Sequence, residues 1–201
     1  MNLEKVRAKA DKGFVFVISG PSGSGKTTLA KKIIKQPQLK GKFIKPISFT
    51  TRPKRRGEKQ GRDYFFVSTQ EFKRLQKAKK ILEHTHYLGY DYGTPRDFIQ
   101  QAIKKGLNII LCLDIKGALF IKKAFPKKTI TIFVKPPSLD IARKRIVSRC
   151  TKTRTEEINK RMRLASKELG HMHRYDYYLI NDNLTKAIQE VVRIIQWIIS
   201  Q

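Results

Sequence analysis

The chain has 201 residues, 40% of them hydrophobic, which suits one packed α/β domain. We expect no membrane span, because no run reaches about 18 uninterrupted apolar residues. The charged N-terminus is also unlike a secretory signal. The two cysteines, Cys112 and Cys150, lie far apart and lack the spacing of a zinc site, so we expect a reduced, cytoplasmic protein.

The balance of charge is strongly basic. Lysine and arginine number 44 against 16 aspartate and glutamate residues, which gives a net charge of +28. Such an excess indicates anionic partners: nucleotides, nucleic acid or a membrane surface. Many lysines form scattered pairs, such as Lys31-Lys32 and Lys104-Lys105, and this pattern is typical of a solvated surface. Most of the excess is therefore interpreted as surface charge, with non-specific nucleic-acid binding as a side activity.

The first predicted strand, 13–18, leads into a glycine-rich loop and then a helical pattern over 26–36. The loop matches G-x-x-x-x-G-K-[ST], and a strand before it and a helix after it are the context in which this motif binds phosphate. Glycines let backbone N–H groups converge on phosphate oxygens, and the helix directs its positive end at the same anion. The predicted ATP-binding residues are Gly20, Pro21, Ser22, Gly23, Ser24, Gly25, Lys26, Thr27 and Thr28. Lys26 would bridge the β- and γ-phosphates, and the Thr27 hydroxyl would ligate Mg²⁺.

A second site is indicated after the strand predicted at 43–50. The loop 52–62 and the strand 63–67 gather arginines, hydroxyls and a tyrosine in one short unit. Guanidinium groups bind phosphate oxygens at two points, and a tyrosine hydroxyl adds a donor. The alternatives for this segment are a solvated basic loop and a nucleic-acid contact.

Three further features follow before the chain returns to regular alternation. Ser68 begins a helix with Glu71 three residues later, the pattern of a capping box. An extended, aromatic segment at 81–92 comes next. Thr94-Pro95 is then expected to cap and open another helix. The polar, aromatic composition of 48–94 indicates an inserted lobe.

Strands and helices alternate through the remainder of the chain. Strands are predicted at 107–113, 129–134 and 177–180. A helix is expected to start at 136–138, the basic stretch 143–163 is expected to be mostly helical, and a last helix should run from the capping residue Asn183 to 200. Continuous apolar strands that alternate with helices predict an α/β fold, in which a parallel sheet is covered on both faces.

From about Phe14 to the C-terminus the sequence resembles the guanylate kinases, a family of P-loop nucleoside monophosphate kinases. The string S-x-T-T-R-x-x-R-x-G-E…G-x-D-Y-x-F, which starts at Ser48 and ends at Phe66, is specific to that family. Segments 81–83, 89–94, 114–117, 136–138, 149–151 and 181–184 agree with it. The resemblance implies one domain with the P-loop NTPase fold over 1–201. Its parts would be a core (1–47, 95–135 and 170–201), a GMP-binding lobe (48–94) and a mobile lid (136–169).

The resemblance also implies an activity and a set of residue roles. The protein would transfer the γ-phosphate of ATP to GMP, and also to dGMP, in purine nucleotide metabolism, as a monomer or homodimer. The GMP-binding residues would be Ser48, Arg52, Arg55, Tyr64, Glu83, Tyr92, Gly93 and Thr94, of which Ser48, Glu83 and Thr94 would contact guanine. The catalytic residues would be Lys26, Arg52, Arg149 and Arg161, the last two from the lid. Asp114 would join Thr27 as an outer ligand of Mg²⁺.

Two positions depart from the family pattern. Cys112 stands where the family usually has a carboxylate that helps to bind the guanine amino group, so base contacts here would be weaker or rearranged. The alternative is that Cys112 is simply a small buried strand residue. Lys116 stands where glutamine is common.

Three other functions are alternatives to a guanylate kinase. The first is a P-loop kinase for another nucleotide. The second is a non-catalytic binding module, which the intact loop at 20–27 disfavours. The third is nucleic-acid binding driven by charge, with an affinity that would fall steeply with salt.

Overall fold

The structure, a computed structural model, describes residues 13–55, 57–149 and 155–201. Its centre is a five-stranded parallel sheet in the order β2-β7-β1-β8-β9. The strands are β1 (Val15–Ser19), β2 (Phe43–Ile44), β7 (Asn108–Cys112), β8 (Thr129–Lys135) and β9 (Tyr177–Ile180). β1 is buried along its whole length because it has a strand on each side and helices on both faces.

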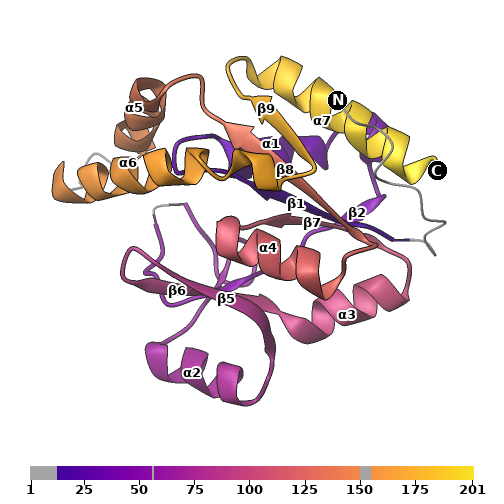
Figure 1. Ribbon diagram of the computed structural model, residues 1–201. Helices are drawn as coiled ribbons and strands as arrows, with labels where there is room; N and C mark the ends of the chain where they lie inside the picture. The colour runs from indigo at the N-terminus through magenta and orange to yellow at the C-terminus, as the bar shows by residue number, and fades with distance from the viewer. Residues whose placement is uncertain (1–12, 56, 150–154) are drawn as a thin grey trace.

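Helices cover both faces of this sheet, as the alternating apolar pattern predicts. α1 (Lys26–Ile33) and α7 (Leu184–Ile199) pack on one face around side chains such as Phe16. α3 (Arg96–Lys104) and α4 (Ile115–Ala124) pack on the other face around side chains such as Val17 (Figure 1). The prediction of an α/β fold with a covered parallel sheet is therefore confirmed.

A second, four-stranded sheet lies beside the first, in the order β4-β3-β6-β5. Its strands are β3 (Phe49–Thr50), β4 (Phe65–Phe66), β5 (Ile81–Tyr87) and β6 (Tyr90–Pro95), and α2 (Thr69–Lys77) packs beneath it (Figure 1). The single strand expected at 43–50 is wrong: β2 joins the core sheet and β3 joins the second sheet. Pro46 lies between them, and proline interrupts a strand because it has no N–H to donate.

Two helices form the remaining layer. α5 (Leu139–Arg149) and α6 (Thr155–Leu169) lie side by side at one end of the molecule (Figure 1). Short 3₁₀ helices occur at Pro37–Leu39 and Met172–Arg174. The basic segment expected to be mostly helical over 143–163 is thus two helices, and residues 150–154 between them lie outside the described part of the chain.

The predicted helix caps are right in two cases and wrong in one. The Ser68 hydroxyl accepts a hydrogen bond from the Glu71 N–H at 3.1 Å, and the Asn183 side chain accepts one from the Lys186 N–H at 3.1 Å. Thr94 was expected to cap α3, but α3 begins at Arg96 without any side-chain cap. The Thr94 hydroxyl instead donates to the buried Glu83 carboxyl on the neighbouring strand at 2.6 Å, so it is not available to cap α3.

Candidate active site

The glycine-rich loop turns tightly between β1 and α1, and two of its glycines could not be replaced. Gly20 has a φ of 141°, and a Cβ there would lie 2.2 Å from the backbone oxygen of Val134. Gly25 has a φ of 86°, and a Cβ there would lie 2.4 Å from the Asn181 Nδ2 atom. A side chain at Gly20 would collide with backbone, whereas a side chain at Gly25 would strain the backbone and displace the Asn181 side chain, so glycine is favoured at both positions.

The loop is held from behind by the last strand and by α5. The Asn181 side chain donates to the backbone oxygen of Ser24 at 2.8 Å, and Arg145 donates to the backbone oxygen of Asn181 at 2.9 Å. At the end of β1, the Tyr175 hydroxyl donates to the Ser19 hydroxyl at 2.8 Å. These bonds, together with the bond from the Ser24 N–H to the Pro21 oxygen at 3.1 Å, fix the shape of the loop.

A cavity of about 200 Å³ opens above the loop, between the second sheet, α4 and α6. Most predicted site residues line it, although they come from distant parts of the chain. Those lining it are Gly20, Pro21, Ser22, Gly23, Gly25, Lys26, Thr27, Ser48, Arg55, Tyr64, Glu83, Tyr92, Gly93, Thr94, Asp114 and Arg161. Ser24, Thr28 and Arg52 do not line it. Arg149 ends α5, and its side chain lies outside the described part of the structure.

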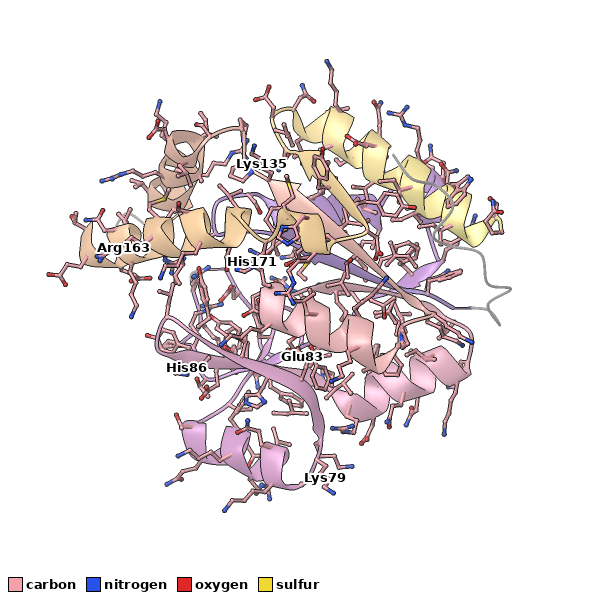
Figure 2. All side chains as sticks on the ribbon, viewed as in Figure 1. Lys79, Glu83, His86, Lys135, Arg163 and His171 are labelled. Carbon is pink, nitrogen blue, oxygen red and sulfur yellow. The ribbon has the colours of Figure 1, made fainter. Side chains whose placement is uncertain are left out.

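One of the residues that line the cavity is a buried carboxylate, Glu83. Glu83 lies on β5 and accepts a hydrogen bond from the Thr94 hydroxyl on β6 at 2.6 Å. Across from it, α4 approaches so closely that a Cβ at Gly117 would lie 2.8 Å from the Glu83 carboxylate, whose place beside α4 is visible in Figure 2. Burial raises the pKa of Glu83 to about 7, and the charge of Asp114 adds to the rise, while the Thr94 hydrogen bond opposes it.

The arginines and tyrosines of the second sheet divide into two groups. Arg55, Tyr64 and Tyr92 line the cavity. The Arg52 guanidinium instead donates to both carboxylate oxygens of Glu58 at 2.9 Å and lies 5.6 Å from the centre of the Tyr64 ring. Arg52 therefore holds the loop and supports Tyr64, and it reaches the cavity only through that ring. Burial raises the pKa of Tyr64 to about 12, so its hydroxyl keeps its proton at neutral pH.

Thr27 and Asp114 face the same cavity at the end of the loop, as expected for a Mg²⁺ site. Asp114 already accepts two hydrogen bonds, from the Gly117 N–H at 2.9 Å and from the Thr85 hydroxyl at 2.6 Å. Among the described residues there is no cluster of three or more His, Cys, Asp or Glu that could hold a metal by itself. This donor set fits Mg²⁺ bound largely by phosphate and water, with one hydroxyl and one outer carboxylate from the protein.

Two charged side chains reach the cavity from α6. The Arg161 guanidinium lies 3.5 Å from the Ser22 hydroxyl of the loop, and its Nε donates to Glu157 at 3.0 Å. Glu168 lines the cavity and is close enough to Lys26 and Asp114 to interact electrostatically with both. Burial raises the pKa of Glu168 to about 7, Lys26 opposes that rise, and Asp114 reinforces it. Lys26 itself donates to the backbone oxygen of Pro21 at 3.3 Å.

The cavity is also lined by Cys112, one of the positions that depart from the family pattern, and by four residues that were not among the predicted site residues: Thr85, Tyr87, Leu113 and Glu168. Thr85 and Tyr87 could have been found from Glu83, because residues two apart on a strand face the same side. Glu168 gave no such signal, since a glutamate near the end of a basic helix is usually a solvated residue.

Comparisons with known proteins agree with this geometry. The family model "Guanylate kinase" matches residues 12–197. This chain belongs to the guanylate kinase family. A guanylate kinase of Caldanaerobacter subterraneus subsp. tengcongensis is 41% identical over 91% of this chain and 86% of the relative. A guanylate kinase of Wolbachia pipientis wMel is 38% identical over 91% of this chain and 89% of the relative.

A solved structure of similar fold is the guanylate kinase of Anaplasma phagocytophilum. It has a TM-score of 0.77 and 29% identity, and the match covers 93% of this chain and 86% of that one. The family resemblance and the activity expected from the sequence, ATP-dependent phosphorylation of a nucleoside monophosphate by a guanylate kinase, are confirmed. Within the described part of the chain, no helix is long and apolar enough to cross a bilayer.

Proposed function

We propose that the cavity aligns ATP with GMP so that the γ-phosphate passes directly from one to the other. ATP would place its phosphates on the loop 20–28. GMP would place its phosphate against Arg55, Tyr64 and Tyr92, and its base against Ser48, Glu83, Gly93 and Thr94. Arg52 would act on GMP mainly by holding this group in place, because Glu58 already occupies its guanidinium.

The observation that carries the proposal is the distribution of charge along one cavity. The loop with Lys26 and the buried carboxylate of the second sheet, Glu83, line the same cavity. Guanine offers two donors on one edge, its ring N1–H and its amino group, and one carboxylate accepts both. Adenine has an acceptor at N1 and no amino group at C2, so it would leave a buried carboxylate facing a lone pair, which costs about 1–3 kcal/mol or more.

The chemistry needs alignment and positive charge more than covalent help. Two anions must be held in line, and the charge that spreads over the transferred group must be neutralised. Lys26, Arg161 and Arg149 supply positive charge from the protein, and Mg²⁺, when it is bound with ATP by Thr27 and the outer ligand Asp114, adds more. Residues 48–94 would form the GMP-binding lobe, and the pair α5–α6 would act as the lid over this site. Closure of the lid would exclude water that would otherwise hydrolyse ATP.

The test is a coupled assay of ADP release with ATP and Mg²⁺, run with GMP, dGMP, AMP, UMP and CMP in parallel. We expect GMP to exceed AMP, UMP and CMP by at least tenfold in kcat/KM, with dGMP also accepted. A higher rate with AMP, UMP or CMP would assign the site to a different P-loop kinase, and ADP release independent of any acceptor would make it an ATPase. The cytoplasmic location, the choice between monomer and homodimer, and non-specific nucleic-acid binding stay predictions.

A further inference from the structure

One face of α6 packs against the rest of the molecule. Ile158, Arg161 and Ala165 follow one another at intervals of three and four residues, so they lie on the same face of the helix. Ile158 and Ala165 are buried, whereas Arg161 lines the cavity. The Arg161 side chain is only 17% exposed, because it extends from α6 toward the phosphate loop.

The Arg161 guanidinium has a different partner on each side. Its Nε at 3.0 Å, and its Nη2, both donate to the same carboxylate oxygen of Glu157, one turn earlier on α6. Its Nη1 donates to the hydroxyl of Ser22, a residue of the phosphate loop 139 positions away in the chain, at 3.5 Å. One edge of the guanidinium is therefore held by the helix, and Nη1 faces the loop.

We propose that Glu157 is a positioning residue for phosphoryl transfer: its carboxylate holds one edge of the Arg161 guanidinium, so that Nη1 is already directed at the phosphate loop when the substrates bind. The inference rests on the proposed function above, in which Arg161 neutralises charge on the transferred group. Glu157 does not itself line the cavity, so it acts through Arg161 rather than on a substrate.

Glu157 has opposite effects on the rate of transfer and on the binding of ATP. An arginine side chain has many rotamers, and a donor that is already in place needs no ordering at the moment of reaction. A misplacement of about 1 Å can lower the rate about a hundredfold. The negative charge of Glu157, however, reduces the attraction of Arg161 for an anion. Loss of Glu157 should therefore slow the transfer without weakening the binding of ATP, whereas general damage to the site would weaken both.

Glu156 provides the matched control. An ordinary pair of charges four residues apart on a helix would stabilise α6 slightly and do no more. Glu156 is the neighbouring residue, is exposed and also lies in the first turn of α6. Glu156→Ala and Glu157→Ala therefore remove the same charge and the same favourable interaction with the positive end of the helix. Only Glu157→Ala releases Arg161.

The experiment measures the single-turnover rate of phosphoryl transfer from ATP to GMP, and separately the dissociation constant of a non-hydrolysable ATP analogue. In Glu157→Ala we expect the transfer rate to fall about threefold to tenfold, the scale of a hydrogen bond to a charged group, and the analogue to bind as tightly as to wild type or more tightly. In Glu156→Ala both quantities should stay within about twofold of wild type.

A double-mutant cycle with Arg161→Ala tests whether Glu157 acts through the arginine. If it does, Glu157→Ala causes no further loss of rate once Arg161 is absent. Three results would overturn the proposal: equal transfer rates in Glu157→Ala and Glu156→Ala, weaker binding of the ATP analogue to Glu157→Ala, or rate losses that multiply in the double variant. Failure of the wild type to phosphorylate GMP would refute the proposed function instead. Thermal unfolding of each variant confirms that the rates compare folded proteins.

Discussion

Lys26 is the lysine of the phosphate loop, and it faces the cavity with its ammonium group at the backbone oxygen of Pro21. We expect Lys26→Ala to lower kcat at least a hundredfold, because a charge that neutralises the transferring phosphoryl group contributes about 3–4 kcal/mol. The fold should be unaffected, since the side chain lies at the surface of a cavity. Steady-state kinetics and circular dichroism measure the two quantities. A folded variant with more than half of the wild-type kcat would remove Lys26 from the mechanism.

Glu83 is the residue on which the choice of base depends. Glu83→Gln keeps the shape of the side chain but replaces one acceptor by a donor. We expect kcat/KM for GMP to fall about tenfold or more, the scale of one charged hydrogen bond. AMP should stay a poor substrate but lose less, so the ratio of the two kcat/KM values should shrink. An unchanged ratio in the folded variant would mean that another residue selects guanine.

The raised pKa of Glu83 gives GMP binding a pH dependence of definite sign. In the empty cavity this carboxyl has a pKa of about 7, so it is increasingly protonated as the pH falls below 7. Guanine offers donors and therefore binds the ionised form, so binding releases a proton and weakens in acid, by up to about tenfold per pH unit. Calorimetry of GMP alone between pH 5.5 and about pH 8.5 measures this slope. Glu83→Gln is the control, because it keeps the titration of the GMP phosphate and of Glu168 while its own slope should be flatter.

At the scale of elements, the loop between β3 and β4 carries two arginines that look alike in the sequence but have different surroundings in the structure. Arg55 lines the cavity, whereas Arg52 is 8% exposed and paired with Glu58. We expect Arg55→Ala to raise the KM for GMP at least tenfold, the scale of a charge-assisted hydrogen bond, with little change for ATP or for the melting temperature. Arg52→Ala should lower the melting temperature as well, because it leaves Glu58 without its partner.

Kinetics with each substrate varied in turn, together with thermal unfolding, test this difference. If Arg55→Ala changed the KM values for ATP and GMP equally, the division of the cavity into two substrate sites would be wrong. If Arg52→Ala were as stable as wild type, Arg52 would not hold the loop as its contacts indicate.

The elements that the sequence predicted well are those whose signal is local. Continuous apolar runs identified the central strands β1, β7 and β8, because strands buried on both faces carry no polar alternation. The phosphate loop was recognised because the glycines that shape its backbone and the lysine and threonine that bind phosphate and Mg²⁺ all fall within eight consecutive positions. The caps at Ser68 and Asn183 are equally local, since each hydroxyl or amide oxygen binds an N–H three residues on.

The features that were predicted wrongly or not at all from the sequence depend on partners far along the chain. The segment 43–50 contains an apolar run, yet its two halves pair with β7 and with β6, in different sheets. Thr94 has the position of a cap, but its hydroxyl donates a hydrogen bond to the Glu83 carboxylate on the neighbouring strand. Glu168 enters the site only because α6 crosses above the loop, and helix orientation is not encoded in a local pattern.

At the scale of the whole molecule, the net charge of +28 must act on substrates that are themselves anions. We expect kcat/KM for GMP to fall several-fold as salt rises from about 20 to 200 mM, because the field that steers the nucleotide is screened over about 10 Å at 0.1 M. kcat should change little, since the transfer takes place out of contact with bulk salt. Equal kcat/KM at both salt concentrations would mean that the basic surface is not used to capture substrate.

The position of β1 in the middle of the core sheet also has a consequence for biosynthesis. β1 is among the first described segments of the chain, yet its neighbours are β7 and β8. At about 5–20 residues per second, a ribosome needs on the order of ten seconds to add the roughly 90 residues that separate β1 from β7. During that interval a strand with four consecutive apolar residues and two unpaired edges emerges into the cell. A nascent chain of this kind depends on being shielded, so synthesis speed and chaperone supply should influence the yield of folded enzyme more than the stability of the finished molecule does.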